Sequence, residues 1–311
     1  MIPSTPARFS VPQHGLSYPT VILSRGLDLI ERGVWAGMKA VRLRRWMKNF
    51  VTDEDRYFAA CVLDGLIYRS DEQTTALVRH LFERSLSDLV RASSCPLGRL
   101  DDWLERLRSD VDPKIRLVPA VKRADATHKS AHLVSRLMKR QLSVRPNWVA
   151  KPWEIAAHIT RGAQVLVFID DFLGTGKQFE ELIVSENLGW IFGSAYVIYA
   201  PFAAHRAGIE YLNSPSRYPA LKIVAAEVLD KRHQLFESDG CVFDDGINTP
   251  ELAQMHYFDM LGRVGISLTG DDRLGFGGLG LSYCFEHAVP DNNLPLLWHP
   301  GRSDWVPLFD R

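Results

Sequence analysis

The segment VLVFIDDFLGTGKQF, residues 165–179, predicts the fold of this chain and locates a ligand site within it. VLVFI is apolar at every position, which is typical of a central parallel strand covered on both faces. We expect a strand over residues 165–170 with the acidic pair Asp170 and Asp171 at its end, followed by a glycine-rich turn at 174–177 and a helical run. This order of strand, acidic pair, small-residue turn and helix is typical of an open, doubly wound α/β sheet.

The turn has the composition of an anion-binding site. In open parallel sheets ligands bind beyond the carboxyl ends of the strands, and the amides that enter a helix N-terminus point at a bound anion. Glycines at 174 and 176 permit a nest of N–H donors, to which a threonine and a lysine add side-chain donors. We therefore predict that a phosphate binds over Gly174, Thr175, Gly176 and Lys177.

The acidic pair beside this turn indicates a second kind of ligand group. Ribose 2- and 3-hydroxyls are donors that carboxylates accept, and Mg²⁺ takes carboxylate oxygens together with phosphate. Asp170 and Asp171 are therefore predicted to hold a ribose or a magnesium ion, and sugar with phosphate is a phosphoribosyl group. The alternative is a solvated turn, but two adjacent acids that close an all-apolar strand are costly unless they are used.

Spacing argues against two other phosphate-binding motifs. An ATP-binding P-loop needs a glycine five residues before its Gly-Lys pair and a serine or threonine after it. Asp171 and Gln178 occupy those two positions. The dinucleotide fingerprint GxGxxG fails as well, because position 179 is phenylalanine.

Three further extended segments, separated by helical stretches, lie at residues 115–121, 194–201 and 222–229. Apolar residues from Leu27 to Leu107 recur at intervals of three and four, which predicts three or four packed helices. We expect an N-terminal all-helical module over residues 1–110 and an α/β domain over residues 111–311. The Gly-, Pro- and Trp-rich C-terminal part is expected to form short strands and ordered loops.

Two apolar faces are expected within the helical module. The first is formed by Leu27, Ile30, Val34, Met38 and Val41, and the second by Phe58, Cys61, Val62, Gly65 and Leu66. Thr52 precedes Asp-Glu-Asp and is the expected N-cap of the second helix.

Composition excludes several classes of protein. Lys and Arg number 37 and Asp and Glu number 37, so only local patches offer charge to nucleic acid or anionic lipid. The four cysteines form no CxxC pair that would suggest zinc, and reduced thiols fit a cytoplasmic location. We expect neither a signal peptide nor a membrane span, since no run of about eighteen apolar residues occurs.

Residues 166–173 with the following turn resemble the type I phosphoribosyltransferase signature of four apolar residues, two acids, two apolar residues and a Thr-containing glycine turn. Phe172 and Lys177-Gln178 depart from the usual pattern. More of the chain resembles the phosphoribosyltransferase-like proteins of bacterial conflict and antiviral systems, which include retron effectors. The blocks that carry this resemblance are WMKNF at 46–50, DDFLGTGKQ at 170–178, and EHAVPDNNLPLLW with WVPLF near the C-terminus.

The resemblance implies a type I phosphoribosyltransferase-like Rossmannoid sheet and an antiphage effector that binds phosphoribosyl pyrophosphate or a nucleotide. It implies chemistry at the ribose anomeric carbon that alters nucleotide pools, with Asp170 and Asp171 as catalytic residues and Mg²⁺ as cofactor. A retron complex would supply a reverse transcriptase with its multicopy DNA and a helix-turn-helix protein as partners. A non-catalytic sensor of nucleotide or phosphoribosyl pyrophosphate, and a scaffold of a defence complex, remain alternatives.

Phosphoribosyltransferases bind pyrophosphate with a second loop after an earlier strand. In this chain the corresponding donors are Lys122, Arg123, His128, Lys129 and Ser130. Weaker candidates are His205 and Arg206 at another strand end, a flap at Asp271, Asp272 and Arg273, and a base pocket formed by His287, Asn292, Asn293 and Trp298. Trp35, Arg44, Arg45, Trp46, Lys48 and Asn49 combine basic and aromatic side chains that would suit nucleic acid or a protein partner.

Overall fold

The structure, a computed structural model, describes residues 8–93, 103–109, 114–125, 138–139, 142–240, 242–243 and 245–310. The chain divides into two compact units. Unit 1 comprises Met1–Asp71 together with Asp230–Arg311, and unit 2 comprises Glu72–Leu229. Both chain ends therefore belong to the same unit, and the sheet that carries the predicted ligand site lies in the other.

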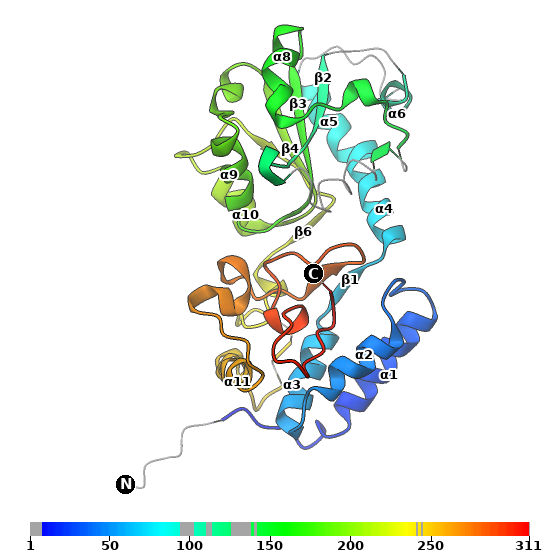
Figure 1. Ribbon diagram of the computed structural model, residues 1–311, viewed down its shortest axis with the longest axis vertical. Helices are drawn as coiled ribbons and strands as arrows, with labels where there is room; N and C mark the ends of the chain where they lie inside the picture. The colour runs from blue at the N-terminus through cyan, green and yellow to red at the C-terminus, as the bar shows by residue number, and fades with distance from the viewer. Residues whose placement is uncertain are drawn as a thin grey trace. The chain divides into compact units, whose positions relative to one another are not determined.

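Unit 2 contains a five-stranded sheet in which every pairing is parallel (Figure 1). Its strands are β2 (Ile115–Pro119), β3 (Val165–Leu173), β4 (Tyr196–His205), β5 (Lys222–Ile223) and β6 (Glu227–Leu229). The order is β2-β3-β4-β5, with β6 also paired to β4. Residues Val165–Ile169 are each at most 1% exposed, so the expectation of an interior strand covered on both faces is confirmed.

Alternate residues of β3 enter two separate cores, as a strand covered on both faces requires. Val165, Val167 and Ile169 pack with the helices that precede the sheet in sequence. Leu166 and Phe168 pack with the helices on the opposite face. Figure 1 shows α9 and α10 on one side of this sheet and α4 and α5 on the other.

The first of these helical layers is formed by α4 (Asp71–His80), the π-helix η1 (Leu81–Ser85), α5 (Leu86–Ala92) and α6 (Trp103–Leu107). The second is formed by α8 (Ile155–Thr160), α9 (Lys177–Ser185), the 3-10 helix η6 (Gly189–Gly193) and α10 (Arg206–Leu212). Because Val78, Phe82 and Val90 are buried in the sheet's own core, the segment after Asp71 belongs to unit 2. The division therefore differs from the expected boundary at residue 110.

Unit 1 is built on the helices α1 (Tyr18–Glu31), α2 (Ala40–Lys48), α3 (Asp53–Asp64) and α11 (Pro250–Arg263). Thr52 caps α3 as expected, its Oγ1 accepting from the Asp55 amide at 3.1 Å. A short strand, β1 (Ile67–Arg69), follows α3 and pairs in parallel with β7 (Tyr283–Phe285). The expectation of an all-helical segment is wrong at β1, where the chain leaves its helix at Gly65 to meet a distant strand.

The first expected helical face is also interrupted. Helix α1 ends at Glu31, and the chain turns through Gly33 and Gly37, whose φ angles are +74° and +82°. Val34 and Val41 are consequently 41% and 61% exposed instead of packed. The second expected face is confirmed, because Phe58, Cys61, Val62 and Leu66 are all buried.

The block WMKNF packs against the last residues of the chain. The Trp46 indole donates to the Leu296 carbonyl at 3.1 Å, and the Asn49 side chain donates to the Val306 carbonyl at 2.8 Å. Phe50 meets Trp305 edge to face, with ring centroids 5.5 Å apart. Two of the sequence blocks that carry the family resemblance therefore form one core.

The remaining elements of unit 1 are short 3-10 helices: η7 (Lys231–His233), η8 (Gly270–Leu274), η9 (Phe276–Gly278) and η10 (Pro295–Leu297). The C-terminal part, expected to form strands and loops, contains η9 and η10 in addition to the short strand β7. Unit 2 adds η3 (Arg123–Asp125), η4 (Pro146–Trp148) and η5 (Pro152–Glu154). Cys61 and Cys284 are buried free thiols, and Cys95 and Cys241 lie outside the described residues. Across the described ranges, no helix combines the length and apolar character that crossing a bilayer requires.

Candidate functional site

Strand β3 continues past the acidic pair instead of ending at it. Asp170 pairs with Pro201, and Phe172 and Leu173 pair with Ala203 and Ala204 of β4. The expected end of this strand at residue 170 is therefore three residues too early, because the apolar side chains that follow the acids are also buried. The long partner strand thus holds the backbone of both aspartates in a fixed, extended form.

The Asp170 carboxyl group is positioned by two donors. Its Oδ2 accepts from the Tyr199 hydroxyl at 2.8 Å, and its Oδ1 accepts from the Asp171 amide at 2.9 Å. Burial, reinforced by the neighbouring Asp171 charge, raises the pKa of Asp170 well above the ordinary carboxyl value. A carboxyl group with a raised pKa at the end of a sheet strand is a functional-site candidate on physical grounds.

Tyr199 is a site residue that the sequence analysis missed. It lies on β4, is 1% exposed, and stacks on Phe179 of α9 with ring centroids 4.1 Å apart. Burial and the Asp170 charge raise the pKa of its hydroxyl, so it stays a donor. The available signal was a tyrosine inside an otherwise apolar strand, since a buried tyrosine hydroxyl usually has a partner.

The raised pKa of Asp170 predicts a trade-off between function and stability. The folded state binds the proton of the Asp170 carboxyl group more tightly than the unfolded chain does. The contribution of this proton to the free energy of unfolding is therefore complete below the unfolded-state pKa. It is lost as pH rises through the raised folded-state pKa. Asp170→Asn, which cannot ionise, should therefore be more stable than the parent protein at neutral pH, with the difference disappearing in acid. Urea denaturation at several pH values measures this, with the exposed Asp28→Asn as control. A less stable Asp170→Asn protein at neutral pH would contradict it.

The turn after β3 lies against the start of α10. Gly174 is buried, and a Cβ at Gly208 would lie 2.2 Å from the Gly174 carbonyl oxygen. Gly176 is the N-cap of α9 and has a φ of +85°, in the left-handed region that favours glycine. The packing of two glycines thus sets the path of the turn, with its backbone leading into a helix N-terminus as an anion site requires.

The side chains of the turn differ in exposure. Thr175 is half-buried, and its Oγ1 lies 3.5 Å from the Lys177 amide, at the limit of a hydrogen bond. Lys177 and Gln178 are exposed in the first turn of α9. The structure therefore places the four predicted phosphate donors on one turn, which is separated from the acidic pair by two residues.

Gly176→Ala is expected to destabilise the protein and weaken ligand binding. An alanine there meets a left-handed backbone, which costs about 1–2 kcal/mol, and its Cβ would lie 2.9 Å from Leu212 and Tyr211 side-chain carbons. Gly162→Ala is the matched control, because Gly162 has a φ of +101° but no heavy atom within 4 Å of an added Cβ. Urea denaturation should show a larger loss for Gly176→Ala. Equal losses would mean that α10 does not constrain the turn.

Of the five expected pyrophosphate-loop donors, His128, Lys129 and Ser130 lie outside the described residues. Lys122 forms ion pairs with Glu181 of α9 at 3.3 Å and with Asp125 at 3.4 Å. Burial lowers the pKa of Lys122, but these carboxylates outweigh it and the net shift is upward.

Arg123 is also engaged with neighbouring groups. Its amide donates to the Glu186 carboxylate at 2.6 Å, and its guanidinium lies 5.2 Å from the Trp153 ring centroid. Glu181 is one helical turn from Lys177, so α9 places the Lys122 ion pair on the same helix face as Lys177, the last residue of the 174–177 turn. Lys122 is thus near the site but held by carboxylates.

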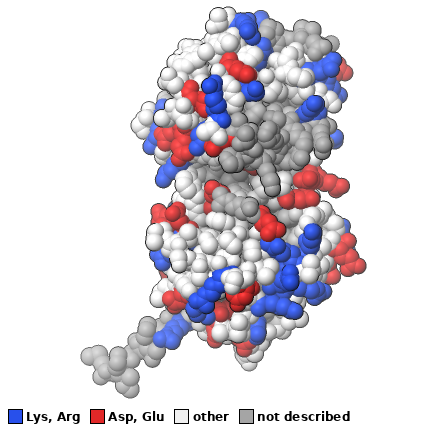
Figure 2. Space-filling model, in the orientation of Figure 1, with Lys and Arg blue, Asp and Glu red and all other residues white. Residues whose placement is uncertain are grey.

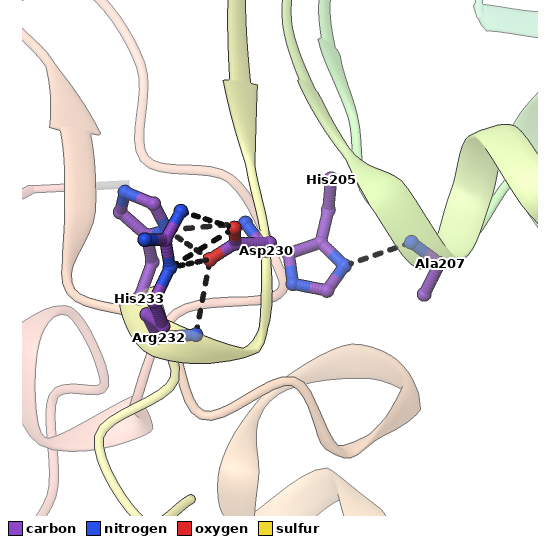
Figure 3. Close-up of polar contacts among 5 residues, drawn as sticks. All are labelled: His205, Ala207, Asp230, Arg232 and His233. Atoms are coloured by element: carbon purple, nitrogen blue, oxygen red, sulfur yellow. Dashed lines mark hydrogen bonds and ion pairs between the residues drawn. The ribbon is translucent and has the colours of Figure 1, made fainter. Parts of the chain in front are cut away.

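His205 has a structural role at the end of β4. It is 1% exposed, and its Nδ1 accepts from the Ala207 amide at 3.2 Å, which caps α10 (Figure 3). Arg206 is exposed at the start of the same helix. In unit 1, Figure 3 also shows Asp230, whose carboxylate accepts from the Arg232 amide and guanidinium and so caps η7.

The expected C-terminal base pocket is wrong for two asparagines, whose side chains hold neighbouring loops together. Asn293 is fully buried and its side chain bonds the Tyr283 amide and the Pro290 carbonyl, while Asn292 donates to the Phe276 carbonyl. The indole of Trp298 donates to the Asn293 carbonyl at 3.3 Å.

His287 lies beside a cavity of unit 1. Its ring stacks on Phe285 with centroids 5.0 Å apart. The cavity has a volume of about 250 Å³, and its lining includes Lys39, Arg42, Tyr68, Glu286 and His287. All the residues that line this cavity belong to unit 1, whereas the turn after β3 belongs to unit 2.

The expected flap at 271–273 is a short 3-10 helix. The Arg273 guanidinium lies 3.7 Å from the Phe258 ring centroid, and the Arg273 carbonyl accepts from the Tyr257 hydroxyl at 2.7 Å. Asp271 and Asp272 are exposed. The third residue of this segment is thereby anchored to α11.

The basic and aromatic cluster of the N-terminal helices separates into two parts. Trp35 and Trp46 are 6% and 0% exposed and belong to the core, and Asn49 bonds the C-terminal segment. Arg44, Arg45 and Lys48 are exposed. Only the basic side chains of this cluster are therefore available to a partner.

A comparison with protein families assigns the chain. The family model PRTase-CE matches residues 43–311. This range includes the acidic pair, the glycine turn, the block WMKNF and the C-terminal residues against which WMKNF packs. The chain belongs to the PRTase-CE family. PRTase-CE membership confirms the resemblance to phosphoribosyltransferase-like proteins, and the parallel sheet agrees with it. The match extends over most of both units, so the PRTase-CE family pattern includes unit 1 as well as the sheet of unit 2. No curated protein and no solved structure matches the chain.

Proposed function

We propose that this PRTase-CE protein binds a phosphoribosyl compound or nucleotide at the end of β3 and acts at the ribose anomeric carbon. The observation that carries the proposal is the Asp170–Asp171 pair, held in extended form immediately before the turn that caps α9. Carboxylates suit ribose hydroxyls, and turn amides suit a 5-phosphate. The two groups lie in sequence order on one βα unit, as a phosphoribosyl ligand needs.

Each part of the site has a distinct task in this reaction. The amides of 174–177 and the Lys177 ammonium would bind the 5-phosphate, and the acidic pair would orient the ribose. Cleavage at the anomeric carbon builds positive charge on the sugar, as in other glycosyl transfers. Carboxylates fixed nearby stabilise such charge without reorganising during the reaction. The Tyr199 hydroxyl would keep the Asp170 carboxylate in place.

Magnesium fits the residues present. Mg²⁺ usually takes one or two carboxylates and completes its coordination with water and substrate phosphates. Asp170 and Asp171 supply such a pair, and within the described ranges no three His, Cys, Asp or Glu side chains form a cluster that would hold a metal. Phosphate groups of the ligand would therefore be needed to retain the ion. When bound, the magnesium ion would neutralise the charge of these phosphates.

We further propose that this chemistry serves an antiphage effector of the retron type, located in the cytoplasm, whose activity alters nucleotide pools. A reverse transcriptase with its multicopy DNA and a helix-turn-helix protein are the partners proposed for such a complex. The support is the sequence resemblance through WMKNF at 46–50, DDFLGTGKQ at 170–178 and the C-terminal blocks. Co-purification of these partners with the tagged chain from its native host tests the assembly.

A non-catalytic sensor is the second candidate, and one observation favours it. Lys122 is a predicted donor to departing pyrophosphate, but its ammonium group pairs with Glu181 and Asp125 instead. A pocket that binds the ligand without this cation would report its presence without breaking its bond. The two candidates share the binding step and differ only in whether a product forms.

One experiment separates these candidates. Isothermal titration with phosphoribosyl pyrophosphate and with nucleoside monophosphates, each with and without Mg²⁺, measures binding. Mass spectrometry of the same mixtures, and of nucleotide pools in cells that express the chain, measures turnover. Binding with altered pools supports the enzyme, and binding without product supports the sensor. If none of these ligands binds, the proposed site is refuted.

A further inference from the structure

Helix α2 carries an uncompensated concentration of positive charge. Residues 32–52 contain six basic residues, Arg32, Lys39, Arg42, Arg44, Arg45 and Lys48, and no acidic residue, in a chain whose net charge is zero. Figure 2 shows Lys and Arg side chains gathered over this part of unit 1. The imbalance is therefore local, as a patch for an anionic partner would be.

The spacing of the helix puts three of these side chains on one exposed face. Leu43, Trp46 and Met47 are the buried positions of α2. At about 100° per residue, positions 44, 45 and 48 lie opposite them, together with Val41, which is 61% exposed. We call Arg44, Arg45 and Lys48 the basic face.

The part of the chain that the structure describes does not neutralise the basic face. Among the described residues Arg44, Arg45 and Lys48 make no hydrogen bond or ion pair, in contrast to Arg42, which pairs with Asp310. Other arginines of unit 1 are also paired, as Arg25 is with Asp64. Three adjacent long cations without carboxylate partners repel one another, and an external anion would relieve this repulsion.

Helix stability does not explain this charge distribution. Cations favour the C-terminal end of a helix dipole, which accounts for Arg45 and Lys48 in the last turn. Lys39, however, is the N-cap of α2, where a positive charge is unfavourable, and no acidic residue occupies the first turn. The positive charge therefore extends along the whole helix, including the N-terminal end where the dipole disfavours it.

The residue types on this face select among anionic partners. Single-stranded nucleic acid binds by stacking on exposed aromatics, but Trp35 and Trp46 are buried in the core. Interfacial helices insert large apolar side chains into a bilayer, and within α2 itself, Ala40–Lys48, Val41 is the one exposed large apolar residue. A face of cations with one small apolar residue suits the backbone and the major groove of duplex DNA, which admits an α-helix. The RNA major groove is too narrow for this.

We propose that the basic face of α2 binds the phosphate backbone of double-stranded DNA. The inference is independent of the phosphoribosyl site, because α2 belongs to unit 1 and the acidic pair to unit 2. Three phosphate contacts predict a log–log salt slope of about −2.7, which means about 40-fold weaker binding between about 50 and 200 mM salt.

Fluorescence anisotropy with a labelled DNA duplex of about 20 base pairs tests the proposal. The triple variant Arg44→Gln, Arg45→Gln, Lys48→Gln keeps helix propensity, since glutamine is close to both parent residues. This variant should bind the duplex at least about tenfold more weakly than wild type does. Its affinity should also depend much less on salt concentration. The matched control removes the same charge from exposed helical positions of unit 2, through Arg79→Gln, Arg84→Gln and Arg91→Gln. The control should keep both the wild-type affinity for the duplex and the wild-type salt slope.

The wild-type salt titration does not depend on the folding of any variant, and circular dichroism verifies that both triple variants are folded. The double variant Asp170→Asn, Asp171→Asn of the 311-residue chain should bind the duplex as wild type does. Three results would overturn the proposal: a flat wild-type salt slope, equal losses in the two triple variants, or preferential binding of single-stranded DNA, an RNA duplex or phosphatidylserine vesicles.

Discussion

The double substitution Asp170→Asn, Asp171→Asn is expected to weaken binding of phosphoribosyl pyrophosphate or nucleotide by about 10²–10⁴-fold and to abolish any turnover. Hydrogen bonds to charged groups contribute about 1.5–3 kcal/mol each, and about 1.4 kcal/mol changes an equilibrium constant tenfold. Asparagine retains the shape of the side chain and an oxygen that accepts from Tyr199. The loss would therefore come from the charge and not from collapse of the strand.

Isothermal titration measures this effect directly, and mass spectrometry of cell nucleotide pools measures its consequence. The matched control is Asp28→Asn with Glu31→Gln, which removes two exposed negative charges from α1 in unit 1. That protein should bind and act as wild type does. If the Asp170 and Asp171 variant folds and still binds its ligand with unchanged affinity, the acidic pair is not the ribose or magnesium site.

The largest stability effect is expected from Trp46→Ala. Trp46 is fully buried, and its indole donates to the Leu296 carbonyl. Truncating a buried tryptophan to alanine lowers the free energy of unfolding by about 3–5 kcal/mol, because packing is lost and a cavity remains. The Leu296 carbonyl would also lose its donor, which adds to the loss.

Urea denaturation followed by circular dichroism checks this prediction. Trp190→Ala is the control, because Trp190 is 42% exposed and its replacement should change stability by no more than about 1 kcal/mol. Trp46→Phe separates packing from the hydrogen bond. Similar effects for Trp46→Ala and Trp190→Ala would mean that the two chain ends do not stabilise each other as one unit.

The local pattern of the sequence was enough to predict the sheet and the glycine turn that follows β3. An all-apolar strand, an acidic pair and glycines before a helix are constrained by neighbours in sequence, since strand and helix periods repeat within a few residues. Strand β3, the turn at 174–177 and α9 therefore lie where the pattern places them, apart from three extra strand residues. The exposure of Arg44, Arg45 and Lys48 also follows from helical spacing once the tryptophans are assigned to the core.

Tertiary structure alone decided the partners of these elements. The Tyr199 contact with Asp170, the Lys122 pair with Glu181 and the β1–β7 pairing join residues 29, 59 and more than 200 positions apart. The Trp46 contact with Leu296 spans 250 positions and assigns the two chain ends to one unit. Periodicity specifies which face of an element is apolar, but it does not specify what covers that face. Shape, burial and the pairing of buried polar groups make that choice in the folded chain.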